Sequence, residues 1–349
     1  MASKRLQRWL RLSPLRHARL YHLARFYVKR DRIRMFVRRR GDAEERVLPL
    51  MKEAMVKYHW DPDEFYMYDY CSLSPQERLS FVPEYEKNIF CDKVNDCEDS
   101  RIFDSKWTSY CKFRSFYKRD CVMVTPPSVR NDPELIAFLK KHSRCIVKPD
   151  SNASGRGIFM VDGVDPADAM EQIVKHIGHR SGHYIVEELI RQSQELSMFH
   201  PSSVNSLRMR SFRFDDRVEI LPCNFRIGRG GSVVDNTGKG GISAALDGNG
   251  VVIAACDESG IRYVTHPDTG VPILGACIPK WEEAVALVKQ LAMVVPTVRY
   301  VGWDLALTDD GWVMIEGNDK GMFVGIQKTL QKGFRPELDR ILSEMQISL

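Results

Sequence analysis

Three residues in the C-terminal third of the chain have the types and spacing to bind a divalent cation. The segment YVGWDLALTDDGWVMIEGN (300–318) holds two apolar runs joined by Asp-Asp-Gly, which predicts a β-hairpin. Glu316 and Asn318 are two residues apart and share one face of the second strand, and Asp304 on the first strand can reach that face. Two carboxylates and an amide oxygen suit Mg²⁺. A solvent-exposed hairpin with incidental acids is the alternative.

A lysine followed by small residues could bind phosphate groups. The segment CIVKPDSNASGRGIFMV (145–161) predicts a strand ending near Lys148, a loop, and a returning strand. Small residues let backbone N–H groups approach phosphate oxygens, and the lysine adds positive charge. The loop residues concerned are Ser151, Ser154, Gly155 and Gly157. The segment lacks the G-x-x-x-x-G-K-[ST] pattern of a P-loop, and an ordinary turn is the alternative.

An apolar strand that ends in two acids could contact a nucleotide base. In YIVEELIRQSQEL (184–196), the strand leads into Glu187 and Glu188, and the extended residues up to Ile190 offer backbone groups to a purine edge. Glu195 could then accept hydrogen bonds from ribose hydroxyls. Acidic strand ends are common, so this segment does not identify a nucleotide site by itself.

The elements expected around these segments are those of an α+β protein. Asn131-Asp132-Pro133 and Asp165-Pro166 predict capped helix starts with proline in the first turn. A further helix is expected over 280–293. Residues 41–100 are expected to be mostly helical. Short strands dominate from residue 206 onward, and individual strands are expected at 144–148, 158–161, 183–189 and 300–308.

Taken in this order, the segments resemble the ATP-grasp superfamily. The residues that carry the resemblance are DSKW with Lys106, IVKP with Lys148, SNASGRG (151–157), IVEELI (185–190) and Asp304…Glu316-x-Asn318. Other blocks are similar to the sugar-transfer-associated ATP-grasp family, namely PSSVNSLRMRSF (201–212), NFRIGRGGSVVDNTGKGGI (224–242), HPDTG (266–270) and IPKWEE (278–283). The resemblance covers about residues 100–330.

The resemblance implies nucleotide contacts from the first half of the matching region. Lys106 and Lys148 would contact ATP phosphates, and the loop 151–157 would close over them. The implied adenine and ribose contacts are Glu187, the backbone of Glu188 and Ile190, and Glu195.

The second half of the matching region would supply the metal and substrate contacts. Asp304, Glu316 and Asn318 would hold one or two Mg²⁺ that bridge the β- and γ-phosphates. The cations implied near the transferring phosphoryl group are Arg208, Arg226 and Lys239, where surface strand charge is the alternative for the two arginines. Asn205, Asp235 and Asn236 are candidates for substrate contact or for loop structure.

The implied fold is the ATP-grasp fold, in which two α+β subdomains clamp MgATP, here after a helical, basic N-terminal region. The expected boundaries are 1–100 for that region (basic at 1–40), 101–185 for the lid subdomain and 186–349 for the C-terminal subdomain with the metal and nucleotide site. Two departures matter. Typical relatives carry an N-terminal α/β domain that contributes the acceptor site. Many also place an arginine where this chain has Gly302, so Arg208, rather than Arg226, is predicted to replace it.

The implied activity is ligation. ATP would phosphorylate a carboxylate to an acyl phosphate, and an amine or another nucleophile would displace phosphate. The family's name suggests a small-molecule or glycan-precursor carboxylate from cell-envelope polysaccharide synthesis. A kinase that phosphorylates a hydroxyl is the alternative, with Asp235 as proton acceptor. A nucleotide-binding adaptor without turnover is the second alternative.

Positive charge is concentrated at the N-terminus. Residues 1–40 contain 14 lysines and arginines and one acidic residue, interleaved with leucines and aromatics, whereas the whole chain has a net charge of +5. Such a stretch can lie on an anionic membrane. A solvated helical hairpin whose apolar side packs on the body is the favoured alternative, and nucleic acid is the least favoured partner.

Composition narrows the class of protein. The 349 residues are 44% hydrophobic and 28% charged, which excludes wholesale disorder. No run approaches the ~20 apolar residues of a membrane-spanning helix. Nine scattered cysteines without a C-x-x-C pair predict a reduced chain. A cytoplasmic location is therefore expected, at the inner membrane surface if the basic stretch binds lipid.

Overall fold

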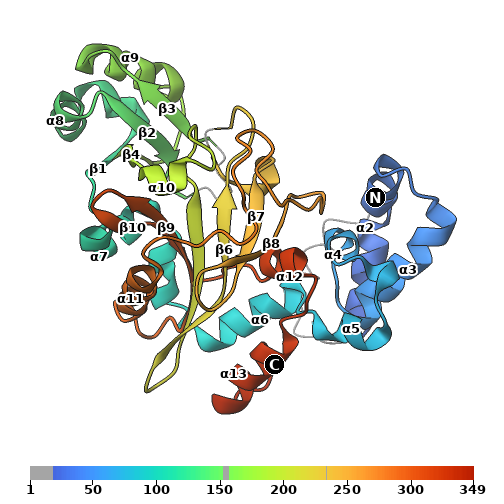
Figure 1. Ribbon diagram of the computed structural model, residues 1–349. Coiled ribbons are helices and arrows are strands. Elements are labelled where there is room, and N and C mark those ends of the chain that lie inside the picture. Colours follow the sequence, from blue (N-terminus) through green and yellow to red (C-terminus); the bar gives the residue numbers. More distant parts are fainter. Residues whose placement is uncertain (1–18, 152–156, 233) are drawn as a thin grey trace. The chain divides into compact units, whose positions relative to one another are not determined.

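The computed structural model describes residues 19–151, 157–232 and 234–349. The chain divides into two compact units (Figure 1). We call residues 1–93 and 322–349 the helical unit and residues 94–321 the two-sheet unit. None of the helices within the described residues combines the length and the apolar character needed to cross a membrane.

The helical unit confirms the expected helical region. Its helices are α2 (Arg19–Arg39), α3 (Glu44–Lys57), α4 (Pro62–Met67), η1 (Tyr70–Ser72), α5 (Pro75–Ser80), α6 (Glu84–Val94), α12 (Val324–Leu330) and α13 (Arg335–Glu344). Its core is largely aromatic, with Trp60, Tyr68 and Phe81 in mutual ring contact. One face of α2, with Phe26 and Ile33, packs into the same core. The apolar face of α2, which is the described part of the basic stretch, therefore packs within the helical unit.

The last 28 residues belong with this helical unit, although the sequence predicts them to be part of the C-terminal subdomain. Gln327 on α12 explains the grouping. Its side-chain oxygen accepts from the backbone N–H groups of Val82 (2.7 Å) and Phe334 (2.9 Å), and its amide donates to the Val82 carbonyl (2.8 Å). The Gln327 amide is fully buried, and both its oxygen and its nitrogen are hydrogen-bonded, so it fixes α12 against the chain at Val82.

The two-sheet unit contains two antiparallel sheets and the helices that cover them. Its helices are η2 (Asp99–Phe103), α7 (Lys106–Tyr117), η3 (Pro126–Asn131), α8 (Pro133–Lys141), α9 (Pro166–Ile177), α10 (Gln194–Ser197), η4 (Thr237–Lys239) and α11 (Trp281–Ala292). The fold is α+β, as predicted.

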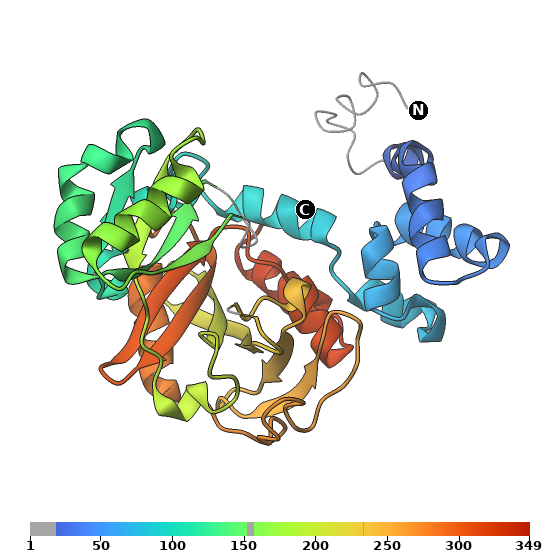
Figure 2. The ribbon, with the colours of Figure 1, turned by 90° about the horizontal axis from the view of Figure 1, so that it is seen from above.

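The smaller sheet has the strand order β1-β4-β2-β3. Its strands are β1 (Cys121–Val124), β2 (Arg144–Pro149), β3 (Phe159–Asp162) and β4 (Tyr184–Glu188). Helices α8 and α9 begin at the predicted caps, where Asp132 and Asp165 each accept two backbone N–H groups. These helices bury one face of the sheet (Figure 2), which leaves Lys148 and Glu187 on the other face. Because β4 belongs to this sheet, residues 186–188 lie in the smaller sheet rather than in the following subdomain.

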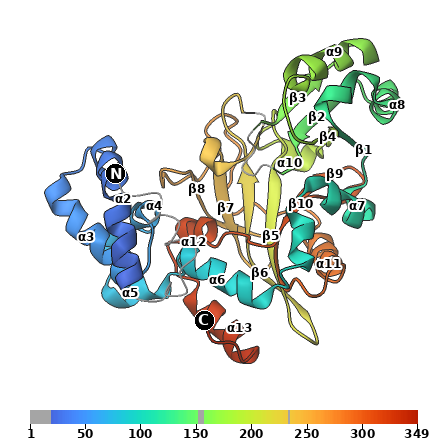
Figure 3. The ribbon, with the colours of Figure 1, turned by 180° about the vertical axis from the view of Figure 1, so that it is seen from behind.

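The larger sheet has the order β10-β9-β5-β6-β7-β8. Its strands are β5 (Ser206–Arg213), β6 (Val218–Ile227), β7 (Ile242–Leu246), β8 (Val252–Cys256), β9 (Tyr300–Thr308) and β10 (Gly311–Asn318). Helices α7 and α11 contact this sheet (Figure 3) and bury residues such as Leu207, Phe225 and Leu305. Alternate residues of the same strands face the opposite side, where the polar side chains gather.

Candidate active site

One row of polar side chains crosses three neighbouring strands of the larger sheet. Glu316 on β10 lies directly opposite Asp304 on β9, and Asp304 lies directly opposite Arg208 on β5. Directly opposite residues on antiparallel strands have side chains about 5 Å apart at Cβ. The predicted hairpin is therefore confirmed, and the register brings the two predicted metal-binding acids together.

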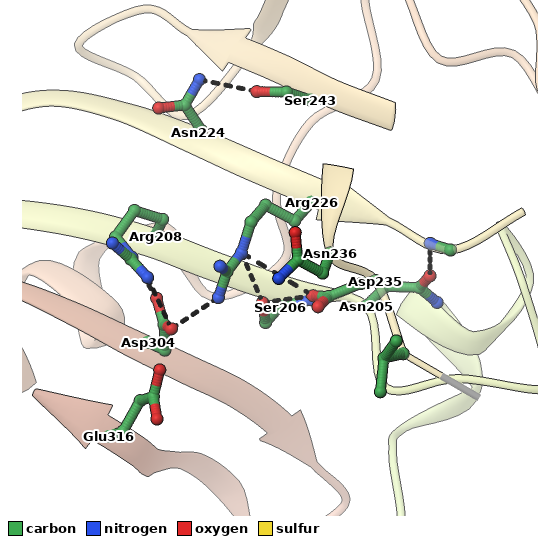
Figure 4. Close-up of polar contacts among 12 residues, drawn as sticks. Asn205, Ser206, Arg208, Asn224, Arg226, Asp235, Asn236, Ser243, Asp304 and Glu316 are labelled. Atoms are coloured by element: carbon green, nitrogen blue, oxygen red, sulfur yellow. Dashed lines mark hydrogen bonds and ion pairs between the residues drawn. The ribbon is translucent and has the colours of Figure 1, made fainter. Parts of the chain in front are cut away.

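Asp304 is held by two arginines from different strands (Figure 4). Arg208 donates to both of its carboxylate oxygens, with the Nη2–Oδ2 bond at 2.8 Å, and Nη2 of Arg226 lies 2.6 Å from Oδ2. The Asp304 side chain is 2% exposed. Burial raises the pKa of Asp304, but the two guanidinium groups outweigh burial and hold that pKa below its usual range. Asp304 is therefore a carboxylate throughout the physiological pH range.

Glu316 points toward Asp304 and has a different electrostatic environment (Figure 4). Burial and the charge of Asp304 both raise the pKa of Glu316, against the opposing effect of Arg208 and Arg226. Asn318 donates to Glu316 at 3.4 Å. Asp304 is buried and Glu316 is half-buried, and two carboxylates that face each other in this way fit a divalent cation, because the cation would remove their repulsion. Glu316 and Asn318 would be ligands there, and Asp304 would share its oxygens with the arginines.

Arg226 connects this row to a second carboxylate. Its Nε donates to the Ser206 hydroxyl at 3.1 Å and lies 3.9 Å from Oδ2 of Asp235. Asp235 accepts from the backbone N–H of Ser206 at 2.8 Å and from the Ser206 hydroxyl. Burial raises the pKa of Asp235, although Arg226 lowers it. The guanidinium of Arg226 thus lies between two acids, Asp304 and Asp235 (Figure 4).

The smaller sheet contributes a second charged cluster, centred on Glu187. The ammonium of Lys148 lies 3.0 Å from Oε2 of Glu187, and Arg119 donates to the same oxygen from Nε (3.1 Å) and Nη2 (2.9 Å). Burial raises the pKa of Glu187, but Lys148 and Arg119 outweigh burial and lower it to about 2. Glu187 is therefore ionised and fixed in place.

Lys106 lies at the first turn of α7 and interacts electrostatically with acids of both clusters. Its side chain donates to the carbonyl of Asp150 at 3.4 Å, and its backbone N–H donates to the same carbonyl at 3.1 Å. Burial lowers the pKa of Lys106, and the nearby acids Glu316 and Glu187 oppose that effect. Lys106, Lys148 and Glu316, all predicted site residues, therefore lie close enough to influence one another's pKa: Glu316 and Lys148 affect Lys106, and Lys148 affects Glu316.

Residues 90–343 match the sugar-transfer associated ATP-grasp family. The chain belongs to this family. The match begins at the end of the helical N-terminal region. It includes both polar clusters described above, so the part of the chain that identifies the ATP-grasp family also contains the candidate site.

Several solved structures are similar to this ATP-grasp protein. D-alanyl-alanine synthetase A from Vibrio cholerae has 13% identity and a TM-score of 0.44, with 72% of this chain and 66% of that chain covered. The Helicobacter pylori D-alanine-D-alanine ligase has 12% identity and a TM-score of 0.45, with 71% and 63% covered. Phosphoribosylamine–glycine ligase from Thermotoga maritima has 15% identity and a TM-score of 0.41, with 70% and 57% covered.

This chain therefore spans roughly half to two thirds of the length of the first structures that it matches. A search of curated proteins gives no significant sequence match.

The remaining predicted nucleotide contacts follow β4 or lie in the loop after β2. The Glu188 side chain accepts from the backbone N–H of Asp120 at 3.2 Å, and its own N–H donates to the Asp120 carbonyl. Ile190 is half-buried, whereas Glu195 on α10 is exposed. Ser151 and Gly157 are exposed at the ends of the predicted phosphate loop. Ser154 and Gly155 lie outside the described residues.

The predicted substrate residues separate into different environments. Asn205 is fully buried, and its amide donates to Gln192 (3.1 Å) and to the carbonyls of Leu196 (2.9 Å) and His200 (3.0 Å), while its oxygen accepts from Gly228 N–H (3.1 Å). These contacts support the loop-structure alternative for Asn205. Asn236 caps η4 by accepting from the N–H of Gly238, and Lys239 is exposed at the end of η4.

Two residues of the site are missing from the sequence prediction. Arg119 and Ser206 contact predicted residues directly. Ser206 could have been found, because it lies two residues before Arg208 in the S-V-N-S-L-R block and so shares its strand face. Arg119 has no such signal, since it is 68 residues from Glu187 in sequence.

Proposed function

We propose that the chain is an ATP-dependent ligase that activates a carboxylate as an acyl phosphate. The observation that carries the proposal is the row Glu316–Asp304–Arg208, with Arg226 bound to the same aspartate. Such a row combines a place for a divalent cation with two fixed guanidinium groups. Phosphoryl transfer depends mainly on positioning and on charge stabilisation of this kind.

Different residues of the chain would bind the phosphates, orient the base and stabilise the charge of the transferring group. Lys106 and Lys148 would bind phosphate oxygens of ATP, and Glu187 would orient the base. When bound, Mg²⁺ would offset the charge of the β- and γ-phosphates. Arg208 and Arg226 are held by Asp304, so their free N–H groups are preorganised for the charge that develops on the transferring group.

The substrate proposed is an acid-bearing sugar or a cell-envelope polysaccharide precursor, with an amine as the acceptor. The support is the family's association with sugar transfer and the two arginines, whose planar donors suit carboxylate and phosphate oxygens. An amine acceptor would give a carbon–nitrogen bond, with release of ADP and phosphate.

The test is to incubate the protein with MgATP, hydroxylamine and a pool of amino, keto and sugar acids, followed by mass spectrometry. A ligase of this kind gives a hydroxamate together with ADP, and the hydroxamate identifies the acid. Glu316→Gln should abolish the product, whereas Glu282→Gln, an exposed acid on α11, should not. ADP with a phosphorylated hydroxyl compound and no hydroxamate would instead show a kinase. Nucleotide binding without turnover would show an adaptor.

A kinase is the second candidate, and Asp235 favours it. Asp235 lies beside Arg226, and burial raises its pKa, which makes its carboxylate a better proton acceptor than an exposed aspartate. A hydroxyl substrate bound near Arg226 could transfer its proton there. Asp235→Asn should then remove kinase turnover while a ligase, which needs no such base for a carboxylate, keeps its hydroxamate reaction.

We also propose that the basic N-terminal stretch contacts an anionic membrane surface. The charge of residues 1–40 supports this, together with exposed apolar side chains on α2, where Leu20 is 77%, Tyr27 53% and Met35 48% exposed. Co-sedimentation with phosphatidylglycerol vesicles should exceed that with phosphatidylcholine vesicles. Replacing Arg30 and Arg32 by glutamine should weaken it, whereas replacing the exposed Lys289 and Lys332 should not. Equal sedimentation of all these proteins would refute the proposal.

A further inference from the structure

Arg119 connects the two clusters of the site. It lies between the end of α7 and the start of β1, and its side chain is 5% exposed. Besides its two bonds to Glu187, it donates from Nη1 to the carbonyl of Met314 at 2.6 Å and from Nη2 to the carbonyl of Ile315 at 3.4 Å. A single guanidinium therefore binds β4 of the smaller sheet and β10 of the larger sheet.

Other contacts fix the plane of this guanidinium. Nη1 also donates to the Tyr117 carbonyl at 3.3 Å, and the guanidinium carbon lies 4.5 Å from the centre of the Tyr117 ring. The Tyr117 ring is itself buried against Tyr110. These contacts define the position that Arg119 takes when it binds both sheets.

The carbonyls that Arg119 binds lie at an irregularity in the hairpin. Met314 pairs with Leu305, but the next pair along the ladder is Glu316 with Asp304, so β10 has one extra residue, Ile315. Without that bulge Ile315 would face Asp304, and Glu316 would lie on the opposite face of the sheet. The bulge therefore decides which side chain faces Asp304, and Arg119 holds the bulge.

We propose that Arg119 is a positioning residue that couples the nucleotide contact at Glu187 to the cation ligand Glu316. This inference rests on the proposed function, because it assigns Glu187 to the base and Glu316 to Mg²⁺. Nucleotide bound beside Glu187 stabilises Arg119 in place, Arg119 stabilises the bulge, and the bulge presents Glu316 to the cation. By linkage, Mg²⁺ must then tighten nucleotide binding by the same factor.

The test measures the affinity for ADP by calorimetry, in Mg²⁺ and in EDTA. For the wild type, Mg²⁺ should tighten ADP binding within the ~5–150-fold range typical of coupled sites. For Arg119→Met, this factor should fall below the wild-type value, and only the direct contact of Mg²⁺ with the phosphates should remain. Arg119→Lys keeps a charge beside Glu187 but lacks the fork that spans both strands. It should recover ADP affinity in EDTA without recovering the effect of Mg²⁺. Arg130→Met, which removes an exposed ion pair with Glu171, is the matched control.

A second measurement uses the wild type alone. ADP in EDTA should slow amide hydrogen exchange at residues 316–318, although these residues belong to the other sheet. A role of Arg119 in folding alone predicts no such protection and predicts an unchanged effect of Mg²⁺ in a folded Arg119→Met; either result overturns the inference. If the wild type binds no ADP in either condition, the proposed function fails first. If it binds ADP with the same effect of Mg²⁺ in every variant, only the role of Arg119 fails.

Discussion

Arg208 occupies the space beside Gly302. A Cβ atom placed on Gly302 would lie 3.3 Å from Cα of Gly321, 3.5 Å from Cδ of Arg208 and 3.6 Å from Nη1 of Arg208. The resemblance to the ATP-grasp superfamily implies an arginine at the position of Gly302, and the Arg208 side chain from the neighbouring strand lies beside that position. This contact gives a structural reason for the prediction that Arg208 replaces the missing cation.

Arg208→Met should lower both activity and stability. It removes a fixed donor beside the phosphoryl group, where loss of one such donor typically costs 10²–10³-fold in kcat. It also leaves the buried Asp304 with one arginine instead of two, and breaking a buried ion pair costs about 3–5 kcal/mol. ATP turnover and urea unfolding measure the two effects. Arg217→Met, at an exposed turn, is the control, and an Arg208 variant with full turnover would contradict the role.

Exchanging Arg208 and Gly302 tests more directly whether Arg208 replaces an arginine at position 302. Arg208→Gly alone should be nearly inactive. Arg208→Gly combined with Gly302→Arg should regain part of the turnover, because the new guanidinium can enter the vacated space once the Gly321 backbone shifts by a few tenths of an ångström. The comparison is valid only at equal folded fraction, which circular dichroism can establish. A double variant no more active than Arg208→Gly would indicate that the two positions do not place a guanidinium at the same point.

Glu316→Gln should stabilise the metal-free protein while it abolishes turnover. Burial and Asp304 raise the pKa of Glu316 in the folded state, so its stability contribution is present below the ordinary glutamate pKa and is lost as pH rises through the folded value. The wild type in EDTA should therefore lose stability above about pH 4.5 relative to the variant. Thermal unfolding against pH measures this. Mg²⁺ should raise the Tm of the wild type only; an equal increase in both proteins would place the cation elsewhere.

Local signals explain which parts of the fold the sequence predicts. The starts of α8 and α9 follow from Asp-Pro caps, and the hairpin of β9 and β10 follows from a turn between two alternating runs. Spacing of two residues is sufficient to place Glu316 and Asn318 on one face. These features need only a few neighbouring residues, so they could be predicted without knowledge of the topology.

The features that could not be predicted from the sequence depend on pairings between residues that are far apart in the chain. Arg208 meets Asp304 across 96 positions, and only because β5 lies next to β9 in the sheet. The bulge at Ile315 cannot be read from hydrophobic alternation, since Ile315 and Glu316 fit either register until Arg119 is known to bind the carbonyls there. Gln327 likewise joins α12 to Val82, 245 positions away, which explains why residues 322–349 group with the helical unit although the sequence places them after the last strand.

Glu187 should make the protein sensitive to acid. Its pKa falls from the ordinary 4.5 to about 2, so its contribution to stability is present above the unfolded value and is lost as pH falls from about 4.5 toward 2. A shift of this size corresponds to about 3 kcal/mol. Urea midpoints between pH 2 and pH 5 should fall steeply for the wild type and less steeply for Arg119→Met, in which one stabilising cation is absent. Identical slopes would show that Lys148 alone sets the pKa of Glu187.

Asn205→Ala should affect folding and leave the chemistry of the folded protein intact. All of its amide contacts are with protein groups, and its removal leaves the Gly228 N–H and two buried carbonyls without their partner. Each unsatisfied buried group costs about 1–3 kcal/mol, so a loss of a few kcal/mol is expected in urea unfolding. Turnover per folded molecule should stay within about twofold of the wild type. Asn236→Ala, which removes a more exposed cap, should cost only about 1 kcal/mol. If Asn205→Ala instead lowered turnover strongly at unchanged stability, Asn205 would be a substrate contact after all.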